Sequence, residues 1–289
     1  MYPLREVQVR MPGRRHIIRI LYGKEVNEPM LRRMQTDLGE LEAMEIGIEE
    51  PFSFHCTGCG KCCRNLGNIL LTPKDMYHMS KELGLNMADF YEGYCETFLR
   101  DEIPVVKLKC CGPERRCIFL KEGKCAVYEA KPVICTLYPL GRYIQPETAK
   151  NFGGSAQTGQ IRFFLNDAVC GDGKERHTVQ GWLESAGIGL EDDFYIEWHG
   201  LIQRLYQFFC GLEGNIRNDW VTLAQIFAFV GIYLCYDTGK EFMPQFQKNA
   251  GEIMETLQKG GYGNYRREDR MLHEIRNRFR HIPAVLPYG

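Results

Sequence analysis

Four cysteines stand close together in the segment FHCTGCGKCC, at Cys56, Cys59, Cys62 and Cys63. In a C-x2-C-x2-C segment, each two-residue spacer lets the backbone wrap around a central ion or cluster, so that three thiolates point inward. The intervening glycines permit a tight backbone and a close approach of the metal or sulfide. Thiolates are the soft ligands that select zinc or iron–sulfur clusters. The spacing therefore predicts a metal centre in this segment.

The fourth cysteine of this segment, Cys63, follows Cys62 directly. Side chains of adjacent residues diverge, so the two thiols seldom ligate one ion in the same way. We predict Cys63 as a ligand with its role left open. It serves a second site, bridges two metals or acts as a redox thiol, and the structural alternative is a small buried residue.

Further along the chain, Cys117 and Cys125 flank a segment that resembles a knuckle, in which Gly123 supplies the turn. Pro132 and Pro139 bracket another cysteine, for which we predict rigid, non-helical backbone. A final cysteine precedes a glycine in a tight loop. With the first segment, these residues supply eight thiols, enough for two four-cysteine centres. The additional predicted ligands are Cys117, Cys125, Cys135 and Cys170.

Five other cysteines have simpler interpretations. Cys110 and Cys111 are adjacent and are ligands, a redox pair or ordinary core residues, with the last two favoured over the first. Cys95, Cys210 and Cys235 lie in apolar segments with helical patterns, which is typical of buried cysteines that act as small hydrophobic residues.

The motifs together resemble the CxxCxxCC (YkgJ-like) cysteine-cluster family. The resemblance runs from about Phe54 to Gly173. It is carried by CTGCGKCC, then LTPKDMYHMSKELGL, then CIFL, CAVYEAKPVICTLYP and the late Cys170. Lys131 and Thr136 stand where the family commonly has arginine, and these departures leave the set of thiolates intact. The resemblance implies a zinc- or iron-chelating domain, often described as an iron–sulfur protein.

The cysteine pattern favours iron–sulfur over zinc. Structural zinc sites usually combine two separated Cys-x2-Cys knuckles or two cysteines with two histidines. Paired knuckles are not repeated here, and the seven histidines do not cluster. Three cysteines at x2 spacing with remote partners fit one or two 4Fe–4S clusters better. Zinc remains the alternative cofactor.

Three functions follow from such a centre. The favoured one is a redox or electron-transfer protein that serves a protein partner. The second is an iron–sulfur-dependent protein-modifying enzyme, because a related cysteine cluster occurs in flagellin lysine N-methylases. The third is a zinc-stabilised protein-binding module. The sequence does not decide whether the protein is an enzyme.

Composition bears on the partners and the cellular compartment expected for the protein. The 36 basic and 37 acidic residues nearly balance, which argues against general nucleic-acid binding. The N-terminus lacks the apolar stretch of a secretory signal, and the longest apolar run, about 223–236, is too short for a membrane span of about 20 residues. We therefore expect a cytoplasmic protein whose thiols are reduced.

The patterns predict an α+β, mostly helical fold. An irregular cysteine-rich metal-binding half with a small β-hairpin precedes a helical half. The expected divisions are a basic segment with a helix over 1–50, a metal-binding domain over 51–175 and a helical region over 190–289 that packs on it. Thr72, Pro73 and Asp75 predict a helix start, and Gly84 predicts its end. Other expected elements are helices over 28–42, 87–99, 219–236, 243–257 and 266–280, and hairpin arms 141–145 and 160–165.

Overall fold

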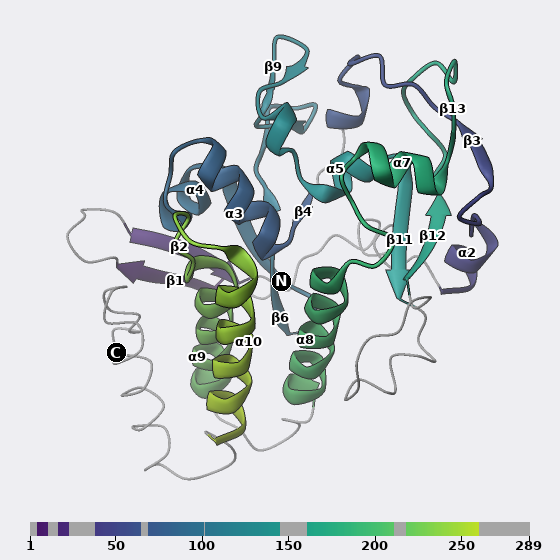
Figure 1. Cartoon of the computed structure of the whole chain (residues 1–289). Helices are drawn as coiled ribbons and strands as arrows, with labels where there is room; N and C mark the ends of the chain where they lie inside the picture. Colours follow the sequence, from purple (N-terminus) through teal and green to yellow (C-terminus); the bar gives the residue numbers. More distant parts are fainter. Residues whose placement is uncertain are drawn as a thin grey trace. The chain divides into compact units, whose positions relative to one another are not determined.

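The computed structural model describes residues 5–10, 17–22, 38–64, 69–100, 102–144, 161–210 and 218–259. Within these ranges it contains eight α-helices and several small antiparallel sheets, an α+β fold (Figure 1). The predicted helix over 266–280 and the loop between the hairpin arms lie outside the described residues, as does most of the helix predicted over 28–42, of which α2 (Leu38–Ala43) is described. No described helix combines the length and apolarity that crossing a membrane requires.

The chain divides into two compact units. The first unit comprises Met1–Lys24, Leu70–Lys107 and Ile202–Gly289, and the second comprises Glu25–Ile69 and Leu108–Leu201. Each unit is therefore assembled from segments that are distant in sequence. The helix α8 (Asp193–Cys210) begins in the second unit and ends in the first.

In the first unit, short strands form two sheets. The N-terminal hairpin pairs β1 (Arg5–Arg10) with β2 (Ile17–Tyr22). A three-stranded sheet has the order β4-β6-β5, and its strand β5 packs against β2. The strands of this sheet are β4 (Leu70–Leu71), β5 (Cys95–Arg100) and β6 (Ile103–Leu108).

The helix α3 (Pro73–Glu82) shows how local residue types fix an element. The Thr72 hydroxyl accepts a hydrogen bond from the Asp75 amide, and the Asp75 carboxylate accepts one from the Thr72 amide at 2.8 Å. This capping box satisfies two amides at the helix start. Gly84 follows the helix with a φ of 64°, a left-handed conformation that suits glycine. The predicted start and end are confirmed.

The second predicted helix is shorter than expected. The helix α4 (Met87–Tyr94) starts as predicted, but residues 95–100 form the strand β5. Along this strand Cys95 and Thr97 are buried, whereas Glu96 is exposed, which is the alternation of a strand. The helical context predicted for Cys95 was therefore wrong, although its side chain is only 3% exposed.

The core of the first unit is largely aromatic. Phe227 and Phe229 lie in α9 (Asn218–Phe229), which continues into a π-helical turn over Val230–Leu234. Their side chains are buried with that of Tyr233. The helix α10 (Phe242–Lys259) packs against α9 and this turn. The helices predicted over 219–236 and 243–257 are thereby confirmed.

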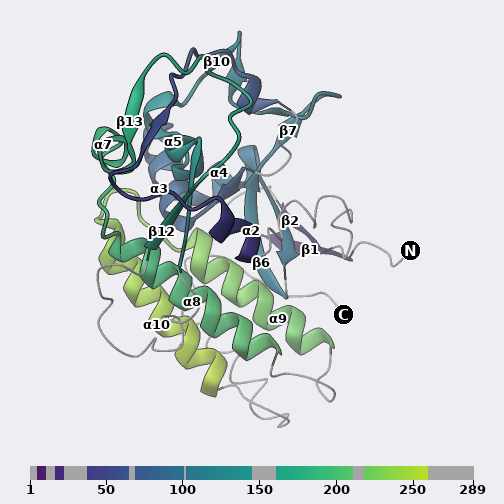
Figure 2. The same ribbon diagram turned by 90° about the vertical axis from the view of Figure 1, so that its right-hand side faces the viewer.

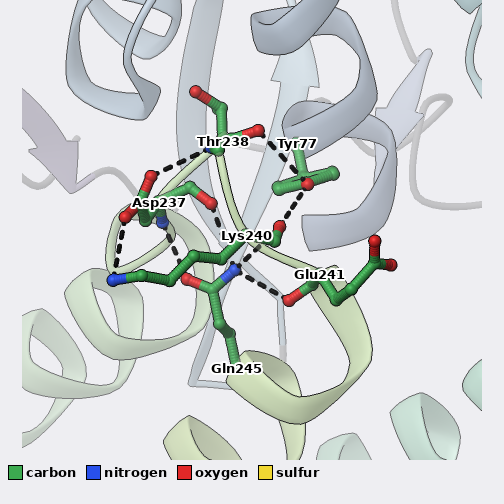
Figure 3. A network of polar contacts seen from close by, with 7 residues as sticks. Tyr77, Asp237, Thr238, Lys240, Glu241 and Gln245 are labelled. Atoms are coloured by element: carbon green, nitrogen blue, oxygen red, sulfur yellow. Dashed lines mark hydrogen bonds and ion pairs between the residues drawn. The ribbon is translucent and has the colours of Figure 1, made fainter.

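A polar network fixes the connection into α10 (Figure 3). The Tyr77 hydroxyl, on α3, donates to the carbonyl oxygens of Thr238 at 3.4 Å and Lys240 at 2.5 Å. The Gln245 amide oxygen accepts from the Asp237 amide at 2.8 Å. These bonds tie the loop to helices on both sides, so the turn before α10 has a defined conformation.

The second unit contains the hairpin predicted from the sequence. The strand β11 (Leu140–Ile144) pairs antiparallel with β12 (Ile161–Leu165). A second pair joins β3 (Pro51–Ser53) to β13 (Arg176–Thr178), which leads directly into α7 (Val179–Ser185) (Figure 2). One hydrophobic cluster lies among these elements. It includes Phe52, Phe54, Leu137, Leu140, Phe163, Cys170 and Leu183.

Candidate metal centre

The C-x2-C-x2-C segment is a loop that ends in a short 3-10 helix over Lys61–Cys63. Gly58 and Gly60 have φ values of 65° and 66°, which glycine adopts without strain. A side chain at Gly60 would also lie 3.0 Å from a methyl carbon of Leu120. The loop exposes Cys56 and Cys59, whereas Cys62 and Cys63 are half-buried. The two glycines thus allow the tight backbone that the sequence predicted for this loop.

Backbone pairing brings the remote Cys170 to this loop. Beyond the β3–β13 ladder, the Phe54 amide donates to the Glu175 carbonyl at 2.9 Å, and the Asp172 amide donates to the His55 carbonyl at 3.3 Å. Between them, Gly171 has a φ of 86°, and a side chain there would lie 2.7 Å from the His55 carbonyl oxygen. The close approach of the two segments therefore requires glycine at this position.

Four thiols meet as a result, and we call Cys59, Cys62, Cys63 and Cys170 the loop thiol group. The sulfur atoms of Cys62 and Cys63 are 4.0 Å apart. The contact with Cys63 raises the pKa of Cys62, and burial adds to the shift. Burial and the neighbouring Cys62 raise the pKa of Cys170 to about 11. A hydrogen bond from the Lys61 amide lowers the pKa of Cys59.

Histidine and carboxylate side chains fasten the start of the loop. The His55 Nδ1 atom lies 3.0 Å from the Asp172 Oδ1 atom, and its Nε2 atom lies 3.6 Å from Glu175. The His177 Nε2 atom is 2.9 Å from the carbonyl oxygen of Phe54. These contacts join the residues before Cys56 to those after Cys170, so they position the thiols rather than supply them.

Tyr138 is a neighbour of the thiols that the sequence reasoning missed. Its hydroxyl accepts a hydrogen bond from the Val169 amide at 2.8 Å and lies near enough to the Cys170 thiol to influence its pKa. Burial raises the pKa of Tyr138. Its ring packs edge-on against Phe54, with the centroids 5.6 Å apart. The available signal was its place in the CTLYP segment, three residues after Cys135.

Three further thiols form a separate set, which we call the hairpin thiol group: Cys110, Cys117 and Cys125. The strand β7 (Cys110–Cys111) pairs with β8 (Arg116–Cys117), and β9 (Leu120–Lys121) pairs with β10 (Lys124–Cys125). Gly123 turns between the last two with a φ of 78°, which confirms the turn predicted there. Burial raises the pKa of Cys117, and the nearby Cys125 and Cys110 thiols add to the shift. For Cys110, the sequence favours a redox or core role over that of a ligand.

The backbone predicted around Cys135 was wrong. This residue lies in the short helix α5 (Val133–Leu137) rather than on non-helical backbone. The bracketing prolines are compatible with this helix because Pro132 is its N-cap residue and Pro139 follows its end. The Cys135 side chain is half-buried.

Residues 55–158 match the CxxCxxCC family, whose description reads "putative zinc- or iron-chelating domain". We therefore call residues 55–158, which are similar to this family, the CxxCxxCC domain. No curated protein and no solved structure matches the chain. The match supports metal binding by the CxxCxxCC domain, as the cysteine spacing predicted.

The thiols of the CxxCxxCC domain, together with Cys170 beyond the matched residues, fit zinc or an iron–sulfur cluster by their chemistry. The loop thiol group offers sulfur ligands alone, and both metals prefer them. The side chains are not arranged around an ion, however. Within the described ranges, no three histidine, cysteine or acidic side chains are placed so that they could hold one.

Proposed function

We propose that the protein holds an iron–sulfur cluster through Cys56, Cys59 and Cys62 of the CxxCxxCC domain and through Cys170, which lies beyond the matched residues 55–158. The observation that carries this proposal is the β3–β13 pairing, which sets Cys170 beside Cys62 of the loop. Three thiols from one C-x2-C-x2-C loop and a fourth from a remote segment are the arrangement of ferredoxin-type clusters. The predicted participation of Cys117, Cys125 and Cys135 stays a prediction.

The exposure of the loop supports an electron-transfer role. Cys56 and Cys59 are exposed, so a cluster held by them lies at the surface, where a protein partner can approach. The Lys61 amide donates to the Cys59 sulfur. Such hydrogen bonds stabilise the negative charge on ligating sulfur and tune a reduction potential. When bound, the cluster supplies one-electron chemistry, and the residues of the chain position it and adjust its potential.

A single zinc ion is the second candidate, and one distance favours it. Two thiolates on a tetrahedral zinc ion with Zn–S bonds of about 2.3 Å lie roughly 3.8 Å apart. The sulfur atoms of Cys62 and Cys63 are 4.0 Å apart. In that case Cys63 is a ligand, and the domain is a zinc-stabilised binding module whose folding depends on the ion.

The test is anaerobic purification of the full chain, followed by iron, zinc and acid-labile sulfide analysis and a visible spectrum. Iron and sulfide in similar amounts, with absorption near about 400 nm that bleaches on reduction, are expected. Stoichiometric zinc without sulfide or colour would overturn the iron–sulfur proposal in favour of the second candidate.

Variants identify the ligands. Cys170→Ser is expected to lose most of the bound metal, because it removes the one thiol that the loop does not supply. The matched control is Cys111→Ser, which replaces an exposed cysteine outside the loop thiol group. Cys63→Ser separates the two candidates, since only the zinc site is expected to lose metal. Equal metal content in Cys170→Ser and the control would contradict the assignment.

A further inference from the structure

The β7–β8 hairpin places two cysteines directly opposite each other. The antiparallel register pairs Cys110 with Cys117 and Cys111 with Arg116. The Ile118 amide donates to the Lys109 carbonyl at 3.1 Å, so the preceding pair of the ladder is hydrogen-bonded. Hydrogen-bonded and non-hydrogen-bonded pairs alternate, and Cys110 and Cys117 therefore form a non-hydrogen-bonded pair.

This register suits a disulfide bond. Residues of a non-hydrogen-bonded pair have Cα atoms about 4.5 Å apart, and their side chains lie on the same face. Disulfides span Cα distances of about 4.4–6.8 Å. The turn of the hairpin also holds the register, since Gly112 adopts a φ of 70° and its carbonyl accepts from the Arg115 amide at 3.0 Å. The two sulfur atoms can therefore meet with little movement of the backbone.

We propose that Cys110 and Cys117 are a thiol–disulfide exchange pair whose co-substrate is a low-molecular-weight disulfide. Cys110 is half-buried and meets the solvent, whereas Cys117 is only 8% exposed. Cys110 is therefore the thiol that attacks an incoming disulfide, and Cys117 is the thiol that resolves the product. The proposal does not rest on the proposed cluster, whose four ligands include neither residue, and it competes only with the predicted role of Cys117 as a further ligand.

The exchange balances in two steps. The Cys110 thiolate attacks one sulfur of the small disulfide, forms a mixed disulfide and releases the first small thiolate. The Cys117 thiolate then attacks the Cys110 sulfur, forms the Cys110–Cys117 bond and releases the second small thiolate. The two protons lost by the cysteines go to the released thiolates, so the protein dithiol is oxidised and the small disulfide is reduced to two thiols.

The neighbouring cysteines are poorer partners. Successive strand residues point to opposite faces, so the exposed Cys111 does not share a face with Cys117, and a vicinal Cys110–Cys111 bond is strained. Cys125 stands opposite Leu120 in a different hairpin. An oxidised Cys117 cannot ligate a metal, so this proposal excludes its predicted role as a ligand in the oxidised protein.

The test uses oxidised glutathione on the full chain. After incubation, acid quenching and alkylation without reductant, trypsin cuts after Lys109, Arg115, Arg116, Lys121 and Lys124. Cys110 and Cys117 then leave on the separate peptides CCGPER and CIFLK, and Cys125 leaves on a third. Mass spectrometry is expected to find CCGPER joined to CIFLK, and reduced glutathione is expected to reverse the link.

Two matched variants make the outcome decisive. Cys111→Ser is expected to keep the link, and Cys110→Ser is expected to abolish it. Both are expected to retain the metal content of the unmodified protein, so failure of this proposal is distinguishable from failure of the proposed function. The proposal is overturned by glutathione adducts without a link, by a bond to the Cys125 peptide, by a bond within CCGPER, or by a link that survives in Cys110→Ser.

Discussion

The Nδ1 atom of His55 lies 3.0 Å from the Oδ1 atom of Asp172, across 117 residues of sequence. His55 precedes the first cysteine of the loop, and Asp172 follows Cys170 by two residues. The contact therefore joins the two segments that supply the loop thiol group. Partners of this kind hold a metal site in shape without touching the metal.

Asp172→Asn is expected to weaken metal binding about 10- to 100-fold, the usual cost of removing a residue that positions ligands. The measurement is zinc affinity by competition with a chromophoric chelator. Asp167→Asn is the matched control, because Asp167 is an exposed aspartate in the same segment. Equal affinities in the two variants would show that the His55–Asp172 contact does not position the thiols.

Gly171→Ala is expected to destabilise the domain by about 2–4 kcal/mol, because it combines a left-handed backbone with a Cβ atom 2.7 Å from the His55 carbonyl oxygen. Gly173→Ala is the control. Its φ is 62°, but its nearest contact is Ser53 at 4.0 Å, so only the backbone cost of about 1 kcal/mol applies. Urea unfolding measures both, and similar losses would exclude a role for the close approach.

The buried ion pair between Arg142 and Asp192 is expected to contribute more to the free energy of unfolding than the exposed pair between Arg162 and Glu45. Arg142 Nη1 lies 2.8 Å from Asp192, with side chains 6% and 14% exposed. Asp192→Asn leaves a buried guanidinium without its counter-charge, which costs about 3–5 kcal/mol. The Arg162–Glu45 pair is 3.7 Å apart and largely exposed, so Glu45→Gln is expected to cost less than about 1 kcal/mol. Equal unfolding free energies for the two variants would refute this ranking.

His199 is expected to make stability fall with acid. Burial, assisted by Arg142, lowers its pKa to about 4, while the unfolded chain has the ordinary value of about 6.5. Between these two pH values, His199 is protonated in the unfolded chain but neutral in the folded protein. The unfolding free energy therefore drops as pH falls from about 6.5 to 4, by about 3 kcal/mol in full.

The comparison variant for this effect is His199→Gln, which cannot gain a proton. Urea unfolding at several pH values between 4 and 7 is expected to show a smaller slope for the variant than for the unmodified protein. Carboxylates contribute to both curves, so only the difference between the curves reports on His199. Parallel curves would mean that folding does not change the pKa of this histidine.

The elements that sequence predicted correctly depend on neighbouring residues. The capping box at Thr72 and Asp75 lies within four positions, and Gly84 needs only its own backbone conformation. The strand β5 was missed because its course depends on pairing with β6, whose sequence lies beyond it. The helix around Cys135 was missed because prolines at both ends suggest an irregular segment when their exact positions in the helix are unknown.

The same distinction applies to the thiols. The cysteine spacing within residues 56–63 predicts a metal site. It does not predict which remote cysteine lies beside that segment in the fold. Cys170 reaches the loop through the pairing of β3 with β13, and Cys110 meets Cys117 through the register of one hairpin. The pairing of β3 with β13 and the register of the β7–β8 hairpin depend on how separate segments align. The residues next to each cysteine in the sequence do not determine that alignment.

The late position of Cys170 in the sequence also determines when it can join the loop cysteines during synthesis. The loop cysteines leave the ribosome more than a hundred residues before Cys170, and β13 follows it only at Arg176–Thr178. Closing so long a loop carries an entropic cost that the strand pairing must offset. The nascent chain therefore exposes the loop cysteines without Cys170 until β13 has emerged, and a metal captured earlier would be held without this proposed ligand.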